Sequence, residues 1–268
     1  MYEELYEELT KEERDRYLEL LGMEEPAAAD LDYLDRLVFA HQCTVSFENL
    51  DPMAGKMVSL ATKDLYDKIV VRGRGGFCFE MNSIFCRLLK ACGFDVYGCR
   101  ARVVRNKDFA PQCLHRGTLV RLDGQLYYVD VGYGGPQPGG AVKVEDGFVR
   151  TVCGQTFRID RADDVWWTLG RVKDDGHEPL IQFMLLPENE PDYLTGAYFC
   201  ATNPDSIFVQ KYMLNRRLEN GTIALVGDLF IRSVDGVHTE EVVSSRERLI
   251  QIAEDYFLIK DAAGLIQD

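Results

Sequence analysis

The chain contains 268 residues, of which 46% are hydrophobic and 28% are charged, a composition typical of soluble globular proteins. This length suffices for one large domain or for two to three small domains that share a core. The formal net charge of −14 repels nucleic acids and anionic membranes, so neither is expected as a partner.

Residues 1–22 are acidic and lack the basic and apolar regions of a signal peptide, and no apolar run reaches membrane-spanning length. The eight cysteines are scattered along the chain and form no C-x-x-C pair. This pattern predicts reduced thiols in the cytoplasm and no metal site, because structural zinc sites commonly use such pairs.

The first third of the chain is predicted to be helical. Leucines and aromatic residues recur at helical spacing over residues 2–21 and 30–43, and Asp30 is placed to cap the second of these helices. A further short helix is expected over 62–70. The strongest helical pattern follows a glycine pair and ends at Gly93, where a C-terminal glycine belongs.

The period of the hydrophobic pattern changes to two after this helix. Strands are predicted over 96–104, 115–122 and 125–132, and Asp123-Gly124 between the last two is a type I′ hairpin signal. More short strands follow at regular intervals, which favours a small sandwich or barrel. Residues 185–194 are expected to form a boundary or a surface connection before a mixed C-terminal part.

Cys78 lies in the first turn of the strongest helix, directly after the turn that Gly75 and Gly76 allow. The free amides and the dipole at a helix start favour the thiolate, which is the nucleophilic form of cysteine. Cys78 is also about 100° around the helix from the stripe that Phe77 begins, so it need not point into the core. Two interpretations stay open, a nucleophile and a small buried residue.

The predicted hairpin brings one of the four histidines to a carboxylate. With a two-residue loop Leu122 pairs with Gln125, which puts Asp130 opposite Gly117. His115 is two residues from Gly117 on the same face, so His115 and Asp130 are diagonal neighbours. A hydrogen bond between them would orient the imidazole and stabilise its protonated form, and Gly117 is expected to leave room for the ring.

Spacing alone does not show that the helix of Cys78 meets the hairpin of His115 and Asp130. A Cys-His-Asp triad therefore stands against a buried cysteine beside a surface histidine. His41 lies on a helical segment and is expected to be structural, whereas His177 and His238 lie in polar turns and are expected to face solvent.

Four segments resemble one known family in sequence order. "RGRGGFCFEMN" (72–82) resembles the R-G-G-[FY]-C-[FY]-E-x-N signature of the arylamine N-acetyltransferases, and "HQCTVSFENLD" (41–51) resembles their H…V-P-F-E-N-L segment. "HRGTLVRLDGQLYYVDVGYGG" (115–135) resembles their histidine and D-V-G-[FY]-G strands, and "TNPDSIF" (202–208) resembles a weaker S-x-P-x-S-x-F stretch. Ser46 stands where the family usually has proline, which is expected to loosen the turn before Phe47.

The resemblance implies an α+β fold with a cysteine-protease-like triad core. An N-terminal helical bundle (1–93) would carry the nucleophile, a central β-barrel (94–187) the histidine and aspartate, and an α/β lid (188–268) would follow. It implies that Cys78 accepts the acyl group, that His115 is its base and that Asp130 orients the histidine.

The resemblance also implies ping-pong acetyl transfer from acetyl-CoA to arylamines or arylhydrazines, as in xenobiotic metabolism. Phe47, Phe77 and Phe79 are candidates for the aryl pocket, with core packing as the alternative. Phe208 and Gly134, in the glycine-rich stretch 132–140, are candidates for CoA contacts, and that stretch could equally be a plain connection.

Neighbouring polar residues are expected to hold the cysteine loop. Glu48 and Arg74 are predicted to form an ion pair, with a solvent-exposed Arg74 as the alternative. Glu80 and Asn82 are predicted to form local hydrogen bonds rather than to transfer protons.

Three other functions remain open at this stage. A macrolactam-forming amide synthase belongs to the same family, a thiol hydrolase of the transglutaminase or papain type would use the same triad, and a non-catalytic binding module could share the fold. The sequence leaves the acceptor amine, the acyl chain and the oligomeric state open.

Overall fold

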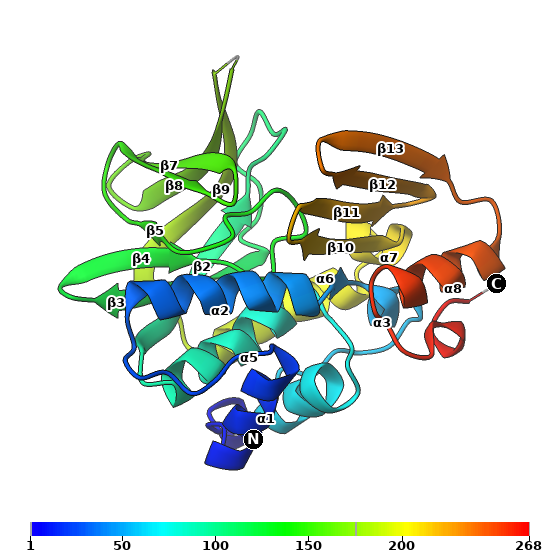
Figure 1. The fold of residues 1–268 in the computed structure, drawn as a ribbon, viewed down its shortest axis with the longest axis horizontal. Helices are drawn as coiled ribbons and strands as arrows, with labels where there is room; N and C mark the ends of the chain where they lie inside the picture. Colours follow the sequence, from blue (N-terminus) through cyan, green and yellow to red (C-terminus); the bar gives the residue numbers. More distant parts are fainter. Residues whose placement is uncertain (1, 175, 268) are drawn as a thin grey trace.

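The computed structural model describes residues 2–174 and 176–267, and Figure 1 shows three parts that follow one another along the chain. Helices fill the lower half of this view, a barrel lies above them on the left, and a second sheet lies on the right. The N-terminal helices are α1 (Lys11–Leu20), α2 (Leu31–Thr44), α3 (Leu50–Met53), α4 (Thr62–Tyr66) and α5 (Cys78–Ala91).

Local capping interactions set the helix limits. Asp30 accepts a hydrogen bond from the amide of Tyr33, which confirms the predicted cap of α2. The predicted single helix over 2–21 is wrong, because Thr10 and Glu13 form a capping box that starts α1 at residue 11. Only a 3₁₀ turn, η1 (Glu3–Leu5), forms before it within the described residues.

Two further sequence signals are confirmed at α4 and α5. A π-helical turn, η2 (Asp67–Val71), continues α4 and so extends this helical segment over the predicted 62–70. Gly93 follows α5 with φ of +90°, the left-handed conformation that glycine adopts readily after a helix.

Eight antiparallel strands form a nearly closed barrel, in the spatial order β5-β4-β3-β2-β9-β8-β7-β6. Asp123 and Gly124 both have positive φ, 50° and 72°, as a type I′ turn requires. The register runs from Leu122↔Gln125 to Thr118↔Val129, which confirms the predicted pairing. The strands are β2 (Asp95–Val103), β3 (His115–Leu122), β4 (Gln125–Val129), β5 (Val142–Lys143), β6 (Phe148–Val152), β7 (Gln155–Arg161), β8 (Trp166–Lys173) and β9 (Gly176–Pro187).

The second sheet combines one strand from the N-terminal third with four strands from the C-terminal part. Its order is β1-β10-β11-β12-β13, and every pairing is antiparallel. The elements are β1 (Phe47–Glu48), β10 (Met213–Leu218), β11 (Gly221–Val226), β12 (Leu229–Val234) and β13 (Val237–Val242), with helices α6 (Tyr193–Thr202), α7 (Ile207–Gln210) and α8 (Arg246–Asp255).

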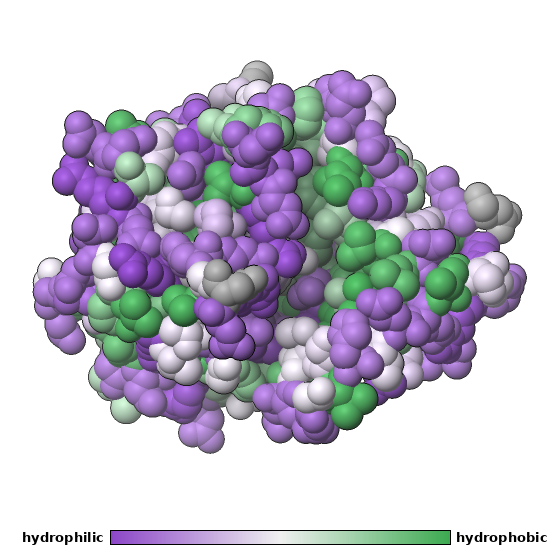
Figure 2. Space-filling view, turned by 90° about the horizontal axis from the view of Figure 1, so that it is seen from above, coloured by the Kyte–Doolittle hydropathy of each residue, from purple (hydrophilic) through white to green (hydrophobic). Residues whose placement is uncertain are grey.

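Helix α5 is the centre of the molecule. Its residues 78–89 are all buried, and it packs against β2 and β3 of the barrel. Seen from above in Figure 2, the surface is hollowed between the barrel on the left and the C-terminal sheet on the right. The start of α5 is therefore enclosed where the helices, the barrel and the second sheet meet. No helix in the described part of the chain is long and apolar enough to cross a membrane.

Candidate active site

Cys78 is the first residue of α5 and is buried, with 3% of its surface exposed. All eight cysteines are free thiols, and the Cys78 Sγ–H lies 3.7 Å from the backbone carbonyl of Leu114, the residue before β3. The helix start is therefore in contact with the strand that carries His115. The two sequence interpretations are both partly right, because Cys78 is buried in the core and yet faces the predicted histidine.

Glycines allow neighbouring backbones to approach the cysteine loop closely. A Cβ at Gly75 would lie 1.8 Å from the carbonyl oxygen of Ser46, and a Cβ at Gly132 would lie 2.8 Å from Cα of Cys78. Both distances are too short for any side chain. The amide of Glu48 donates to the carbonyl of Gly76 at 3.0 Å, so the 46–48 segment lies directly against the glycine turn.

A buried network of ion pairs stabilises the Gly75-Gly76 turn. Arg74 donates to Glu48 Oε1 through Nε and Nη2, at 3.0 and 2.7 Å, which confirms the predicted pair. Lys68 joins Asp51 and Glu80, each at 2.7 Å. Glu80 also accepts from the amide of the N-cap residue of α5, as predicted for a local contact. The charges satisfy one another, so the turn that presents Cys78 is anchored without exposing them.

Ser46 does not leave its turn free. Its hydroxyl donates to the carbonyl of Phe257 at 2.6 Å, and the residue is 3% exposed. This bond ties the turn to the segment after α8, so a hydrogen bond takes over the constraint that a proline ring would have supplied.

His115 and Asp130 form a buried hydrogen-bonded pair, as the hairpin register predicts. His115 Nε2 lies 2.6 Å from Asp130 Oδ2, and the Tyr128 hydroxyl donates to the same oxygen at 2.8 Å. The expected role of Gly117 is wrong, because the space beside it is filled by the Tyr128 ring rather than by the imidazole. A Cβ at Gly117 would lie 2.6 Å from that ring.

Asn82 links the helix of the cysteine to the hairpin. Its Nδ2 donates to Asp130 Oδ1 at 2.9 Å and to the carbonyl of Arg116 at 2.7 Å, while its Oδ1 accepts from the amide of Val131. This contact is longer in range than the local bond predicted for Asn82. A signal for it exists in the sequence, since residue 82 follows Cys78 by four positions on the same helix face.

Charge and burial oppose each other at the three candidate residues. Burial raises the pKa of the Cys78 thiol, against the lowering that its helix position predicts, while the charge and hydrogen bond of His115 lower it. Burial alone would lower the pKa of His115, but the charges of Asp130 and the Cys78 thiolate outweigh this and raise it to about 10. Burial would raise the pKa of Asp130, but His115, Asn82 and Tyr128 lower it.

The raised pKa of His115 favours a proton on the imidazole, and the charge and hydrogen bond of His115 in turn lower the pKa of Cys78, against the larger rise that burial causes. Nε2 faces Asp130, so Nδ1 is the ring nitrogen left to face the thiol.

The other three histidines occupy different surroundings. His41 is fully buried and bonds the Tyr17 hydroxyl at 2.8 Å, and burial lowers its pKa to about 3, as expected of a structural residue. The His177 and His238 side chains are 33% and 59% exposed. The structural role of His41 and the solvent-facing positions of the other two are confirmed, but the predicted turns are wrong, because His177 lies on β9 and His238 on β13.

Four of the residues proposed from the resemblance for substrate and CoA lie together. The Phe208 ring centre is 6.0 Å from that of Phe47 and 5.5 Å from that of Phe77, and a Cβ at Gly134 would lie 2.7 Å from the Phe47 ring. Phe77 is fully buried and Phe47 is 5% exposed, so both also pack in the core.

One of the two tyrosines near the site, Tyr193, carried no sequence signal, whereas Tyr133 is part of the D-V-G-[FY]-G stretch. The Tyr133 ring lies edge-on to the His115 ring at 6.1 Å. A cavity of about 430 Å³ beside His115 is lined by aromatic, polar and backbone groups that include Phe79, Leu114 and Tyr193. These neighbours come from α5, the 104–114 loop and α6, which the sequence pattern does not bring together.

Comparison with known proteins gives a consistent assignment. A family model described as N-acetyltransferase matches residues 30–264. An arylamine N-acetyltransferase of Escherichia coli K12 is 30% identical over 242 residues, which cover 89% of this chain and 84% of the relative.

Solved structures extend the likeness to the whole fold. The structure of the Mycobacterium marinum arylamine N-acetyltransferase superposes with a TM-score of 0.88 at 29% identity and covers 95% of each chain. The structure of the Mycobacterium marinum enzyme in complex with CoA has a TM-score of 0.87 at 28% identity and covers 94% of each chain. With this agreement of sequence, fold and family model, the chain belongs to the arylamine N-acetyltransferase family and is an acetyltransferase.

Proposed function

We propose that this protein transfers an acetyl group from acetyl-CoA to the nitrogen of arylamines or arylhydrazines, through an acetyl-cysteine at Cys78. The buried line of Cys78, His115 and Asp130 at the start of α5 carries the proposal. The names of the relatives and the CoA complex of the Mycobacterium marinum enzyme support the choice of both substrates.

The first half-reaction acetylates the enzyme. The Cys78 thiolate attacks the thioester carbonyl, a C–S bond forms to Cys78, and the C–S bond to CoA breaks. The departing CoA thiolate takes the proton from the His115 imidazolium and leaves as the thiol. His115 is then neutral, with Asp130 still bonded to Nε2, so Nδ1 is ready to accept a proton.

The second half-reaction restores the enzyme. Aryl amines are neutral at pH 7, so the nitrogen lone pair can attack the acetyl-cysteine carbonyl directly. An amide C–N bond forms, the C–S bond to Cys78 breaks, and His115 accepts the proton that the nitrogen loses. The product is the N-acetylated amine, and the thiolate–imidazolium pair is regenerated.

The aromatic cluster gives the substrates a site. Phe47, Phe77 and Phe208 would contact the aryl ring or the pantetheine arm, and Gly134 would let the CoA chain pass close to the backbone beside Phe47. Their packing against one another means that substrate would enter along the edge of the cluster rather than between its rings.

The burial of Cys78 favours transfer over hydrolysis. An acyl group on a residue that is 3% exposed has little access to water, so an amine bound in the hollow would compete well for it. A macrolactam-forming amide synthase would use the same half-reactions and differ in the acceptor.

Intact-mass measurement tests the proposal. Incubation with acetyl-CoA should add one acetyl group, and an added arylamine should remove it and yield the acetylated amine. Cys78→Ala should gain nothing, whereas Cys153→Ala, at an exposed cysteine, should behave as the unmodified protein does. Fast loss of the acetyl group to water without amine dependence would contradict transfer and favour a thiol hydrolase.

A further inference from the structure

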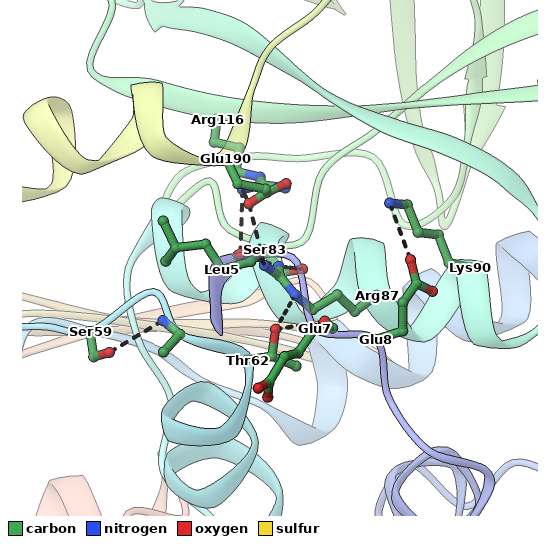
Figure 3. Close-up of polar contacts among 11 residues, drawn as sticks. Leu5, Glu7, Glu8, Ser59, Thr62, Ser83, Arg87, Lys90, Arg116 and Glu190 are labelled. Atoms are coloured by element: carbon green, nitrogen blue, oxygen red, sulfur yellow. Dashed lines mark hydrogen bonds and ion pairs between the residues drawn. The ribbon is translucent and has the colours of Figure 1, made fainter. Parts of the chain in front are cut away.

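Arg116 is a fully buried arginine directly after His115 on β3. Its Nη1 and Nη2 donate to Oε2 and Oε1 of Glu190, at 2.7 and 2.8 Å, in a two-pronged ion pair. Glu190 begins η3 (Glu190–Asp192), in the connection between β9 and α6. Figure 3 shows this pair next to Ser83 and Arg87 of helix α5. The residue after the candidate base is therefore tied to the connection that leads to the C-terminal part.

A second guanidinium reaches the same carboxylate. Arg87 Nη2 lies 3.4 Å from Glu190 Oε2, and Arg87 also donates to Thr62 Oγ1 at 2.6 Å and to the carbonyl of Leu5. Ser83 Oγ lies between the two arginines and accepts from both of them. The cluster thus holds two buried positive charges that share the carboxylate of Glu190, and it joins α5, β3, η3 and the N-terminal segment (Figure 3).

The backbone of residue 116 is fixed as firmly as its side chain. Its carbonyl accepts from Asn82, whose amide group also bonds Asp130. Its guanidinium lies 4.2 Å from the ring centre of Tyr193 on α6. The Cα atoms of residues 115 and 116 are about 3.8 Å apart, so a shift of Arg116 moves His115 with it.

We propose that Arg116, held by Glu190, is a positioning residue that keeps the start of β3, and with it His115, in place against Cys78. The inference rests on the proposed function for the roles of Cys78 and His115. Arg116 touches neither sulfur nor imidazole through its side chain, and it acts through the strand. The fork fits because only a planar guanidinium can contact both Glu190 oxygens and Ser83 at once.

The number of buried charges that each substitution leaves decides which variant is tested. Arg116→Met keeps length and apolar bulk and leaves Arg87 with Glu190, one positive and one negative charge, so the fold should persist. Glu190→Gln would instead leave two buried guanidiniums without that carboxylate, and it is expected to be the less stable variant. Arg116→Lys keeps the positive charge but cannot contact both Glu190 oxygens as a guanidinium does. It gives a second variant that is expected to fold.

The matched control is Arg150→Met. Arg150, whose side chain is 25% exposed where Arg116 is fully buried, pairs with Asp35 and so joins β6 of the barrel to α2. The control also removes an arginine–carboxylate pair of the barrel, but one that involves neither β3 nor η3. Any effect shared by both variants reflects general stability, and an effect confined to Arg116→Met reflects positioning.

The experiment measures alkylation of Cys78 by iodoacetamide from pH 5.5 to 10, read by peptide mass spectrometry, with steady-state kinetics alongside. Besides His115 and Asp130, the titratable groups beside the pair are Tyr128, Tyr133 and Cys200, and they are unchanged in every variant. In Arg116→Met we expect alkylation near pH 6.5 to fall about tenfold, equivalent to a rise of one unit in the apparent thiol pKa, with no loss at pH 10. We expect kcat to fall about 100-fold with an unchanged KM for acetyl-CoA.

Each outcome separates the two levels of inference. A profile and a kcat that match Arg150→Met would overturn the positioning role while leaving the proposed function intact. If Arg116→Met does not fold, Arg116→Lys takes its place. An alkylation profile of Arg116→Lys that matches the unmodified protein would then overturn the positioning role. If Cys78 of the unmodified protein reacts no faster at pH 6.5 than the exposed Cys153, then the proposed function fails and the positioning role fails with it.

Discussion

Replacing Asp130 with asparagine tests how one buried carboxylate sets the state of His115. Oδ1 of Asp130 accepts from Asn82 Nδ2 and from the amide of Gly132, both at 2.9 Å, so the carbonyl oxygen of the new amide must stay there. Its NH₂ group then faces His115 Nε2. A donor at that position requires an unprotonated Nε2, which moves the ring proton to Nδ1 and leaves no acceptor for the Cys78 proton.

The magnitude follows from the pKa of His115. It is about 10 beside the carboxylate, against 6.5 for a free histidine, a difference of 10 − 6.5 = 3.5 units and at most about 5 kcal/mol. Without the carboxylate, burial is opposed only by Cys78, so the pKa of His115 should fall and a smaller fraction of the imidazole should be charged at pH 7.5. We expect the rate of enzyme acetylation at pH 7.5 to fall about 10²- to 10⁴-fold.

Single-turnover acetylation by acetyl-CoA, followed by intact mass between pH 6 and 10, measures this effect. The matched control is Asp160→Asn, because Asp160 faces His177 at 3.7 Å on the barrel surface. The control should acetylate at the unmodified rate. A loss of less than about fivefold in Asp130→Asn would refute the reasoning, because it would mean that the imidazolium does not depend on the carboxylate.

Three further changes test other parts of the structure. Gly75→Ala should lower the free energy of unfolding, measured in urea, by about 1–3 kcal/mol, because its Cβ would lie 1.8 Å from the Ser46 carbonyl oxygen. The control Gly264→Ala, whose Cβ would have its nearest contact at 3.3 Å, should leave this free energy unchanged. Equal free energies for the two variants would contradict the reasoning. The folded pKa of His41 is about 3, below the unfolded 6.5, so its contribution to stability is full above pH 6.5 and is lost as the pH falls toward 3. His41→Gln should therefore flatten the decline of unfolding free energy between pH 6.5 and 4, and an unchanged slope would count against a neutral buried imidazole. Phe208→Ala should raise the KM for acetyl-CoA about 3- to 10-fold with a smaller change in kcat, and an unaltered KM would remove Phe208 from the CoA site.

Local signals predicted the central part of the site well. The Asp123-Gly124 turn fixes its own strand register, and that register alone brings His115 to Asp130. The start of α5 at Cys78 follows equally from neighbouring residues. The resemblance to the family then supplied the step that spacing could not, namely that this helix and this hairpin meet.

Interactions between residues far apart in the chain could not be predicted from the sequence. Arg116 and Glu190 are 74 positions apart, and neither has a pattern that names the other. The break before α1 was missed for the opposite reason, because a capping box at Thr10 outweighs a continuous helical period. The limits proposed between the three parts remain predictions, although β9 ends at Pro187.

Strand β1 has a consequence for the order in which the molecule can assemble. Phe47 bridges Gly76 beside the cysteine turn and pairs with Asn215 of β10. During synthesis the ribosome releases residue 47 long before residue 215, so the edge of this short strand waits unpaired while the barrel forms. The strand that lies against the cysteine turn therefore gains its second backbone neighbour only after most of the chain has emerged.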